Sequence, residues 1–232
     1  MKTLKSGQNK TKEKKAMLLI SGGIDSPVAG KFLQEAGFSL EAIHFSQVPF
    51  TDDTPEKKSL LLARALGLKE MSVVDAGNEF KSIAENARTE YYFILIKIFM
   101  LRCAEKIAHE RKIEFIATGE SLGQVSSQTM SNLNTINSSV EIEVLRPLLF
   151  MSKQEIIDKS IKEGYFETSK GPEMCDVLAS GKPKTRSHIK ETEIEEEKCK
   201  MNELVESAVK KVRIENTAKE VVLENTRVNA CK

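Results

Sequence analysis

The fold is decided by one stretch, Ala16-Met17-Leu18-Leu19-Ile20-Ser21-Gly22-Gly23-Ile24-Asp25-Ser26-Pro27-Val28-Ala29-Gly30. Its first five residues are apolar and predict a buried parallel strand that runs into a tight turn of small residues. Ser26 is suited to cap the helix that follows, and Pro27 would then stand at the first helical position. A strand, a Gly-Gly turn and a helix N-terminus in this order predict an anion site, because backbone N–H groups can approach the ligand closely.

The spacing within this turn excludes two common phosphate-binding motifs. A Walker loop needs Gly-x-x-x-x-Gly-Lys-Ser/Thr, a dinucleotide fingerprint needs Gly-x-Gly-x-x-Gly, and neither pattern is present. The string from Ser21 to Ser26 instead resembles the pyrophosphate loop (PP-loop) of the ATP pyrophosphatases. That resemblance implies cleavage of ATP between its α and β phosphates and transfer of AMP to an acceptor. An ordinary strand-to-helix turn is the alternative interpretation of the same six residues.

Composition favours a protein with a packed core. Of the 232 residues 40% are hydrophobic, and a formal net charge of +1 argues against binding nucleic acid through bulk charge alone. The four cysteines form no C-x-x-C pair and no zinc spacing with the three histidines, so we expect no metal site. No signal-peptide pattern precedes the first strand, and the longest apolar run, residues 91–101, is too short to span a membrane. We therefore expect a cytoplasmic protein with free thiols and no membrane contact.

Alternation of strand and helix patterns predicts a doubly wound parallel α/β sheet. Strands are expected at residues 16–20, 40–45, 71–74, 113–117 and, as the last of the sheet, 144–150; a long helical segment is expected at 80–110. Ser152 and Glu155 fit the capping box of a further helix. We expect a basic flexible tail over residues 1–15, a nucleotide-binding domain over 16–187, and a charged helical extension over 188–232 whose acidic run is typical of a solvated helix face.

Two features outside the first turn carry possible chemistry. Lys97 interrupts an apolar helical run, so it must snorkel, pair with a carboxylate or face a bound anion, and the segment alone leaves these readings open. Residues 118–129 form a second Gly-rich loop after a predicted strand. Ligands of doubly wound sheets bind at the carboxyl ends of strands where the strand order reverses, so this loop is expected opposite the first one.

Three segments together resemble the catalytic domain of the ThiI-type tRNA 4-thiouridine synthetases: residues 21–29 (SGGIDSPVA), 119–129 (GESLGQVSSQT) and 145–148 (LRPL). The resemblance runs from about residue 17 to 209 and implies a Rossmann-like fold of the adenine nucleotide alpha hydrolase type. It also implies that ATP with Mg²⁺ adenylates a tRNA uridine, and that a persulfide sulfur then displaces AMP to give 4-thiouridine. A role in sulfur supply for the thiamin thiazole is implied as well. The alternatives are a PP-loop enzyme with a small-molecule acceptor and a nucleotide sensor without catalysis.

The resemblance assigns site residues by position. Around ATP it places Leu19, Ile20, Ser21, Gly22, Gly23, Asp25, Ser26, His44, Phe45, Lys97, Gly119 and Gln128. Asp25 is implied to be catalytic, acting either on the acceptor or on Mg²⁺, and Lys97 stands where relatives commonly have arginine. Cys175 falls where the family exchanges sulfur with a carrier, with a structural free cysteine as the alternative. Cys103 is predicted to belong to the core.

The implied partners are tRNA and a sulfur carrier such as a rhodanese or a cysteine desulfurase. Family members usually carry a THUMP region that binds tRNA, whereas here a short lysine-rich tail precedes the first predicted strand. We therefore expect that tRNA is captured with a separate tRNA-binding protein or by a dimer.

Overall fold

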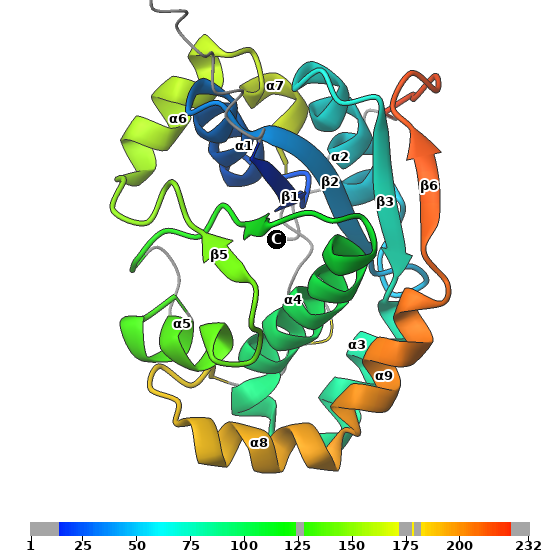
Figure 1. The fold of residues 1–232 in the computed structure, drawn as a ribbon, viewed down its shortest axis with the longest axis vertical. Coiled ribbons are helices and arrows are strands. Elements are labelled where there is room, and N and C mark those ends of the chain that lie inside the picture. Colours follow the sequence, from blue (N-terminus) through cyan, green and yellow to red (C-terminus); the bar gives the residue numbers. More distant parts are fainter. Residues whose placement is uncertain (1–13, 124–127, 172–177, 179–181, 224–232) are drawn as a thin grey trace, which may run out of the picture.

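A computed structural model describes residues 14–123, 128–171, 178 and 182–223 (Figure 1). Within them, one six-stranded sheet has the order β5-β4-β1-β2-β3-β6. The strands are β1 (Lys15–Leu19), β2 (Ser39–Ser46), β3 (Glu70–Asp75), β4 (Phe115–Ala117), β5 (Glu143–Leu145) and β6 (Arg213–Asn216). All pairs among β1–β5 are parallel, and β6 runs antiparallel to β3. The predicted doubly wound α/β sheet is confirmed, with an antiparallel strand added at one edge.

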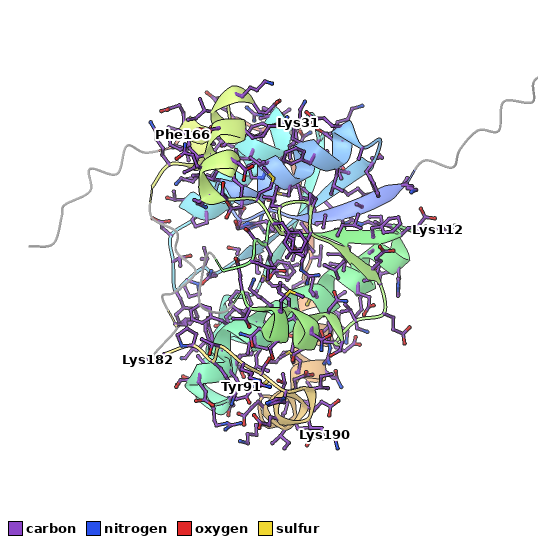
Figure 2. The ribbon with its side chains drawn as sticks, turned by 90° about the vertical axis from the view of Figure 1, so that its left-hand side faces the viewer. Lys31, Tyr91, Lys112, Phe166, Lys182 and Lys190 are labelled. Carbon is purple, nitrogen blue, oxygen red and sulfur yellow. The ribbon has the colours of Figure 1, made fainter. Side chains whose placement is uncertain are left out.

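Helices cover both faces of this sheet. They are α1 (Asp25–Glu35), α2 (Thr54–Ala65), α3 (Gly77–Asn86), the 3-10 turn η1 (Thr89–Tyr91), α4 (Tyr92–Glu110), α5 (Met130–Asn137), α6 (Lys153–Lys162), α7 (Phe166–Ser169), α8 (Ile189–Lys198) and α9 (Met201–Val209). Figure 1 shows α1, α2, α6 and α7 together on one side of the sheet and α3, α4, α8 and α9 on the other. In Figure 2, Lys31 and Phe166 accordingly lie at one end of the molecule, and Tyr91 and Lys190 lie at the opposite end.

Alternation along β1 divides the core between the two faces. Met17 belongs to the cluster formed with α3, α4 and α9, whereas Ala16 and Leu18 belong to the cluster formed with α1 and α2. All three side chains are fully buried. The first strand is therefore covered on both faces, which is why its sequence is apolar after the exposed Lys15.

Helix α4 is apolar on nearly every side because it is enclosed by other elements. It packs between the sheet and the helices α3, α5, α8 and α9. Its predicted start is wrong, since the segment expected as one helix from residue 80 breaks between Asn86 and Thr89. Ala87 and Arg88 are extended there, and the backbone N–H of Arg88 donates to Glu195 Oε2 at 2.8 Å. A bond to α8 thus replaces the bond that a continuous helix would supply.

Two further predictions about local structure are corrected. Ser26 does not cap α1, because the helix already begins at Asp25; the Ser26 hydroxyl instead accepts a hydrogen bond from the Ser21 N–H at 3.3 Å. The strand expected over residues 144–150 ends at Leu145 and is not the last of the sheet. Pro147 has no N–H for a sheet ladder, and the chain turns after it, with the Met151 N–H bonded to the Leu148 carbonyl at 3.0 Å.

Near the end of the described chain, the solvated acidic face is also only partly confirmed. Glu195 is fully buried and Glu196 nearly so, because Arg88 and Arg102 on the η1–α4 side pair with them. The capping box of Ser152 and Glu155 is present at the start of α6, as expected. Lys15 begins β1, and residues 1–13 of the expected tail lie outside the described residues. Among the helices in the described part of the chain, none has both the length and the apolarity needed to cross a membrane.

Candidate functional site

The strand order reverses at β1, which has β2 on one side and β4 on the other. The loops that follow the carboxyl ends of β1 and β4 therefore meet at the switch point of the sheet. Contact between them is close: a Cβ atom on Gly119 would lie 2.8 Å from both the Asp25 carbonyl carbon and the Ser26 nitrogen. The second Gly-rich loop thus lies against the start of α1, as its position in the sequence predicted.

The loop after β1 is held in a tight conformation from the side of α2. Gly22 has a φ of +82°, in the left-handed region, and a Cβ atom there would lie 2.9 Å from the Pro55 carbonyl oxygen. The Lys58 side chain borders the same position, and its Nζ donates to the carbonyl oxygen of Lys170. Burial lowers the pKa of Lys58. Lys58 therefore lies at the edge of this loop. Sequence reasoning did not find Lys58.

His44 supports this loop from β2. Its Nδ1 lies 2.9 Å from the Ile20 carbonyl oxygen and 3.0 Å from the Ser59 hydroxyl, and burial lowers its pKa, so the ring is neutral with Nδ1 donating to Ile20. Its Nε2 is then an acceptor, buried and without a hydrogen-bond partner among the described residues. The neighbouring Phe45 ring packs on Phe99 in the core, at 6.2 Å between ring centroids. Phe45 can therefore offer a ligand its backbone but not its ring.

Asp25 is the acidic residue of the first loop, at the start of α1. Its Oδ1 accepts from Lys153 Nζ at 2.9 Å, and about a quarter of its side chain remains exposed (26%). Lys153 is the first residue of α6, so the Ser152 capping box fixes where this lysine begins its helix. Sequence reasoning missed Lys153, although the capping box that positions it was visible.

Lys97 has a carboxylate partner, Glu120, in the loop after β4. Glu120 also accepts from Arg146 Nε at 2.9 Å and from the Thr118 hydroxyl at 3.2 Å. Burial alone would raise the pKa of Glu120, but the charges of Lys97 and Arg146 outweigh it and hold that pKa at about 2. We name Lys97, Glu120 and Arg146 the charged cluster. It lies beside the switch point, because Glu120 follows Gly119 and Arg146 directly follows β5.

The remaining predicted site residues are Gln128 and Cys175. Gln128 closes the second loop, since its carbonyl oxygen accepts from the Gly123 N–H at 3.1 Å, and its side-chain Oε1 is buried without a partner in the described chain. Cys175 lies outside the described residues. Cys103 is buried, as predicted, and Cys199 is buried as well. Burial raises the pKa of Cys103 strongly and that of Cys199 to about 11, so neither thiol is suited to exchange chemistry.

Replacing Gly119 with alanine is expected to lower the free energy of unfolding by about 3 kcal/mol, because the new methyl group meets backbone atoms that cannot rotate away. Gly37→Ala is the matched control, since Gly37 has a φ of +86° but nothing within 4 Å of an added Cβ. We expect Gly37→Ala to lower the free energy of unfolding by about 1 kcal/mol. Urea unfolding of both variants measures the difference. Equal losses would show that the two loops are not in contact.

A turn that can cradle phosphate at the switch point of a doubly wound sheet, flanked by lysines, defines a PP-loop protein of the ATP pyrophosphatase fold. The model of one family, described as thiamine biosynthesis protein (ThiI), matches residues 11–201. The chain belongs to the ThiI family. This agrees with the resemblance found in the sequence.

Individual relatives support the same assignment. The chain is 39% identical over 207 residues to a probable tRNA sulfurtransferase of Alkaliphilus oremlandii, a match that covers 87% of this chain and 53% of that protein. A protein of the same description from Brevibacillus brevis is also 39% identical over 207 residues, covering 87% and 52%. The chain therefore spans about half the length of the curated relatives it matches.

Solved structures agree with the observed fold. A crystal structure of a 4-thiouridine synthetase–RNA complex with bound ATP is similar over 87% of this chain and 55% of that one, with a TM-score of 0.80 and 34% identity. An NMN synthetase from Francisella tularensis is similar over 88% of this chain and 87% of that one, with a TM-score of 0.53 and 13% identity. This second likeness concerns the fold alone.

Proposed function

We propose that this chain is the ATP-dependent catalytic unit of a tRNA sulfurtransferase, which adenylates a tRNA uridine and exchanges its carbonyl oxygen for sulfur to give 4-thiouridine. The observation that carries the proposal is the likeness, at 34% identity and a TM-score of 0.80, to a 4-thiouridine synthetase crystallised with RNA and ATP. The site geometry supports it independently, because the two Gly-rich loops meet where a nucleotide would bind.

The residues at the switch point fit ATP as a substrate. Gly22 and Gly119 allow the backbone around the first loop to pack closely, because a Cβ atom at either position would meet protein atoms at 2.9 Å or less, and the start of α1 offers N–H groups to phosphate oxygens. The buried acceptor His44 Nε2 and the buried Gln128 Oε1 have no partner in the described chain. We propose that the nucleotide is bound by Leu19, Ile20, Ser21, Gly22, Gly23, Asp25, Ser26, His44, Phe45, Lys97, Gly119 and Gln128.

In the first half-reaction, the uridine O4 attacks the α-phosphorus of ATP, a P–O bond to the β phosphate breaks, and pyrophosphate leaves. We propose that Asp25 orients the acceptor or holds a Mg²⁺ ion that neutralises the leaving group. No group of three or more His, Cys, Asp or Glu side chains in the described residues could hold a metal ion by itself. This suits Mg²⁺, which is commonly bound by one or two carboxylates together with substrate phosphates.

In the second half-reaction, a persulfide sulfur attacks C4 of the uridine and AMP leaves. The S–S bond of the persulfide must then break, because one sulfur stays on the base. We propose that the Cys175 thiolate attacks the sulfur on the carrier side, so that a disulfide forms and the base keeps its sulfur. A separate reductant must reopen this disulfide before the next turnover.

We propose the remaining features of the protein on the same basis. The sulfur carrier is a rhodanese or a cysteine desulfurase, and tRNA is captured with a separate tRNA-binding protein or by a dimer. The ThiI family description also supports a contribution to thiamin thiazole synthesis. We further propose a cytoplasmic location and the division into residues 1–15, 16–187 and 188–232, although α9 and β6 of the last segment pack on the common core and sheet.

The test is chemical. The protein would be incubated with ATP, Mg²⁺, unmodified tRNA and a persulfide donor, and the nuclease-digested tRNA would be examined for 4-thiouridine while pyrophosphate is quantified. We expect both products to rise together. Pyrophosphate release that needs a small-molecule acceptor and leaves the tRNA unthiolated would instead identify a PP-loop enzyme with a different substrate.

A further inference from the structure

We propose that Arg146 is a second phosphate-binding side chain of this site and that Glu120 positions it together with Lys97. The proposal rests on the proposed function for the identity of the ligand, a phosphate of the nucleotide. Its starting point is a charge imbalance, since two cations share one carboxylate in the charged cluster. The cluster therefore carries an excess positive charge.

This excess charge lies where water cannot easily compensate it. The Arg146 side chain is 10% exposed, that of Glu120 9%, and that of Lys97 20%. An uncompensated charge costs free energy at such a position, so buried ions in proteins are paired. A bound anion beside Arg146 and Lys97 would make the cluster neutral.

The hydrogen bonds of Arg146 leave one group unused. Its Nε donates to Glu120 at 2.9 Å and its Nη1 donates to Asn137 Oδ1 at 3.1 Å. Its Nη2 is buried and has no hydrogen-bond partner among the described residues. A guanidinium group is matched to phosphate oxygens and is charged at every relevant pH, so the unused Nη2 is a donor ready for an oxyanion.

A carboxylate shared by two cations does not by itself indicate an anion site, as a second group of charges in this protein shows. Glu195 is also shared by two cations, Arg88 and Lys198, at 2.8 Å from each. Those side chains are 49% and 47% exposed, and Arg88 also pairs with Glu90 at 3.6 Å, so both water and a second carboxylate compensate the charge. The charged cluster has neither that exposure nor, among the described residues, a second carboxylate paired with its cations. It is also beside the nucleotide loops, whereas the Glu195 cluster joins η1 and α8.

The position of the cluster in the sheet indicates on which side of the first loop a bound anion would lie. Glu120 directly follows Gly119 in the chain. Gly119 lies against the start of α1, since a Cβ atom on it would touch Asp25. Arg146 is bonded to the last residue of β5, the neighbour of β4 in the sheet. An anion contacting Arg146 and Lys97 would therefore lie on the β4–β5 side of the loop that ends in Ser26.

Binding of inorganic pyrophosphate tests the proposal without RNA or a sulfur donor. Arg146→Lys keeps the charge but removes the planar donor pair, and we expect its dissociation constant for pyrophosphate to rise at least about 10-fold, the effect of losing one charge-assisted hydrogen bond. Glu120→Gln replaces one of the two accepting oxygens with an NH2 group, so Arg146 or Lys97 loses the partner that positions it, and we expect the dissociation constant for pyrophosphate to rise at least about fivefold, with a smaller rise in unfolding temperature on binding. Calorimetry and thermal unfolding measure both.

The matched control is Arg88→Lys, which changes the exposed arginine of the Glu195 cluster and should leave pyrophosphate affinity unchanged. Wild-type affinity in Arg146→Lys would overturn the proposal, as would unchanged or tighter binding by Glu120→Gln. If Arg146→Lys lowers affinity for tRNA but not for pyrophosphate or AMP, the phosphate belongs to the RNA and the nucleotide assignment is wrong. A wild-type protein that binds pyrophosphate but forms no 4-thiouridine contradicts the proposed function and not this inference.

Discussion

Asp25→Asn is expected to lower the rate of pyrophosphate release by about 100- to 10,000-fold while the protein stays folded. Asp25 is the carboxylate between the glycine-rich turn after β1 and the first turn of α1, where the proposed function has it orient the acceptor or hold Mg²⁺. Its pairing with Lys153 is partly exposed, so losing this ion pair should cost at most about 1 kcal/mol of stability. Pyrophosphate production with ATP and tRNA would be compared with the urea unfolding of the same variant.

The structure offers a close control for this experiment. Glu35 and Lys159 also join α1 to α6, with Glu35 Oε1 and Lys159 Nζ 2.8 Å apart, but at the far end of α1. Glu35→Gln should therefore lose a similar helix-to-helix ion pair without any loss of pyrophosphate release. Similar activity in Asp25→Asn and Glu35→Gln would show that Asp25 only joins the two helices and takes no part in the chemistry.

Much of the fold could be predicted because the local sequence patterns of strands, turns and helix ends agree with the order of elements in a doubly wound sheet. The apolar run of β1, the Gly-Gly turn and the glycines that end α1 and α2 each specify the same local structure. Strand β6 could not be predicted, because four residues with two charges have no clear alternating pattern. Its pairing is set by the free edge of β3 and by Arg213, which bonds Glu56 on α2 at 2.6 Å.

The sequence predicted the two loops of the site, but it did not predict the ion pairs that connect them to other segments. Spacing within residues 16–30 predicts a phosphate-binding turn, because all of its parts are adjacent in the sequence. Glu120, Arg146 and Lys153 come from three separate segments, and their relation to Lys97 or Asp25 depends on the order of the strands. Sequence reasoning named both the ion pair and the anion ligand for Lys97. The structure shows the ion pair, and the ligand role stays a proposal.

Cys175→Ser is expected to separate the two half-reactions of the proposed function. Adenylation needs the phosphate loop, Mg²⁺ and the uridine carbonyl, none of which involves a thiol, so pyrophosphate release should stay within about twofold of wild type. Thiolated product should fall at least about 100-fold under repeated turnover, because a serine hydroxyl cannot resolve a persulfide by forming a disulfide. Pyrophosphate and 4-thiouridine would be quantified in the same reaction.

Cys103 and Cys199 serve as controls for this prediction, because their surroundings differ from what sulfur exchange requires. Cys103 lies inside α4 and is fully buried, and Cys199 is 3% exposed, with its Sγ donating to the Glu196 carbonyl oxygen at 3.4 Å. Burial keeps both thiols protonated by raising their pKa values, so neither offers the thiolate that attacks a persulfide. Cys103→Ala and Cys199→Ala should thus thiolate tRNA as the wild type does, in proportion to folded protein. Normal thiolation by Cys175→Ser, together with its loss in either alanine variant or in Cys231→Ser, would place the sulfur-exchanging thiol elsewhere.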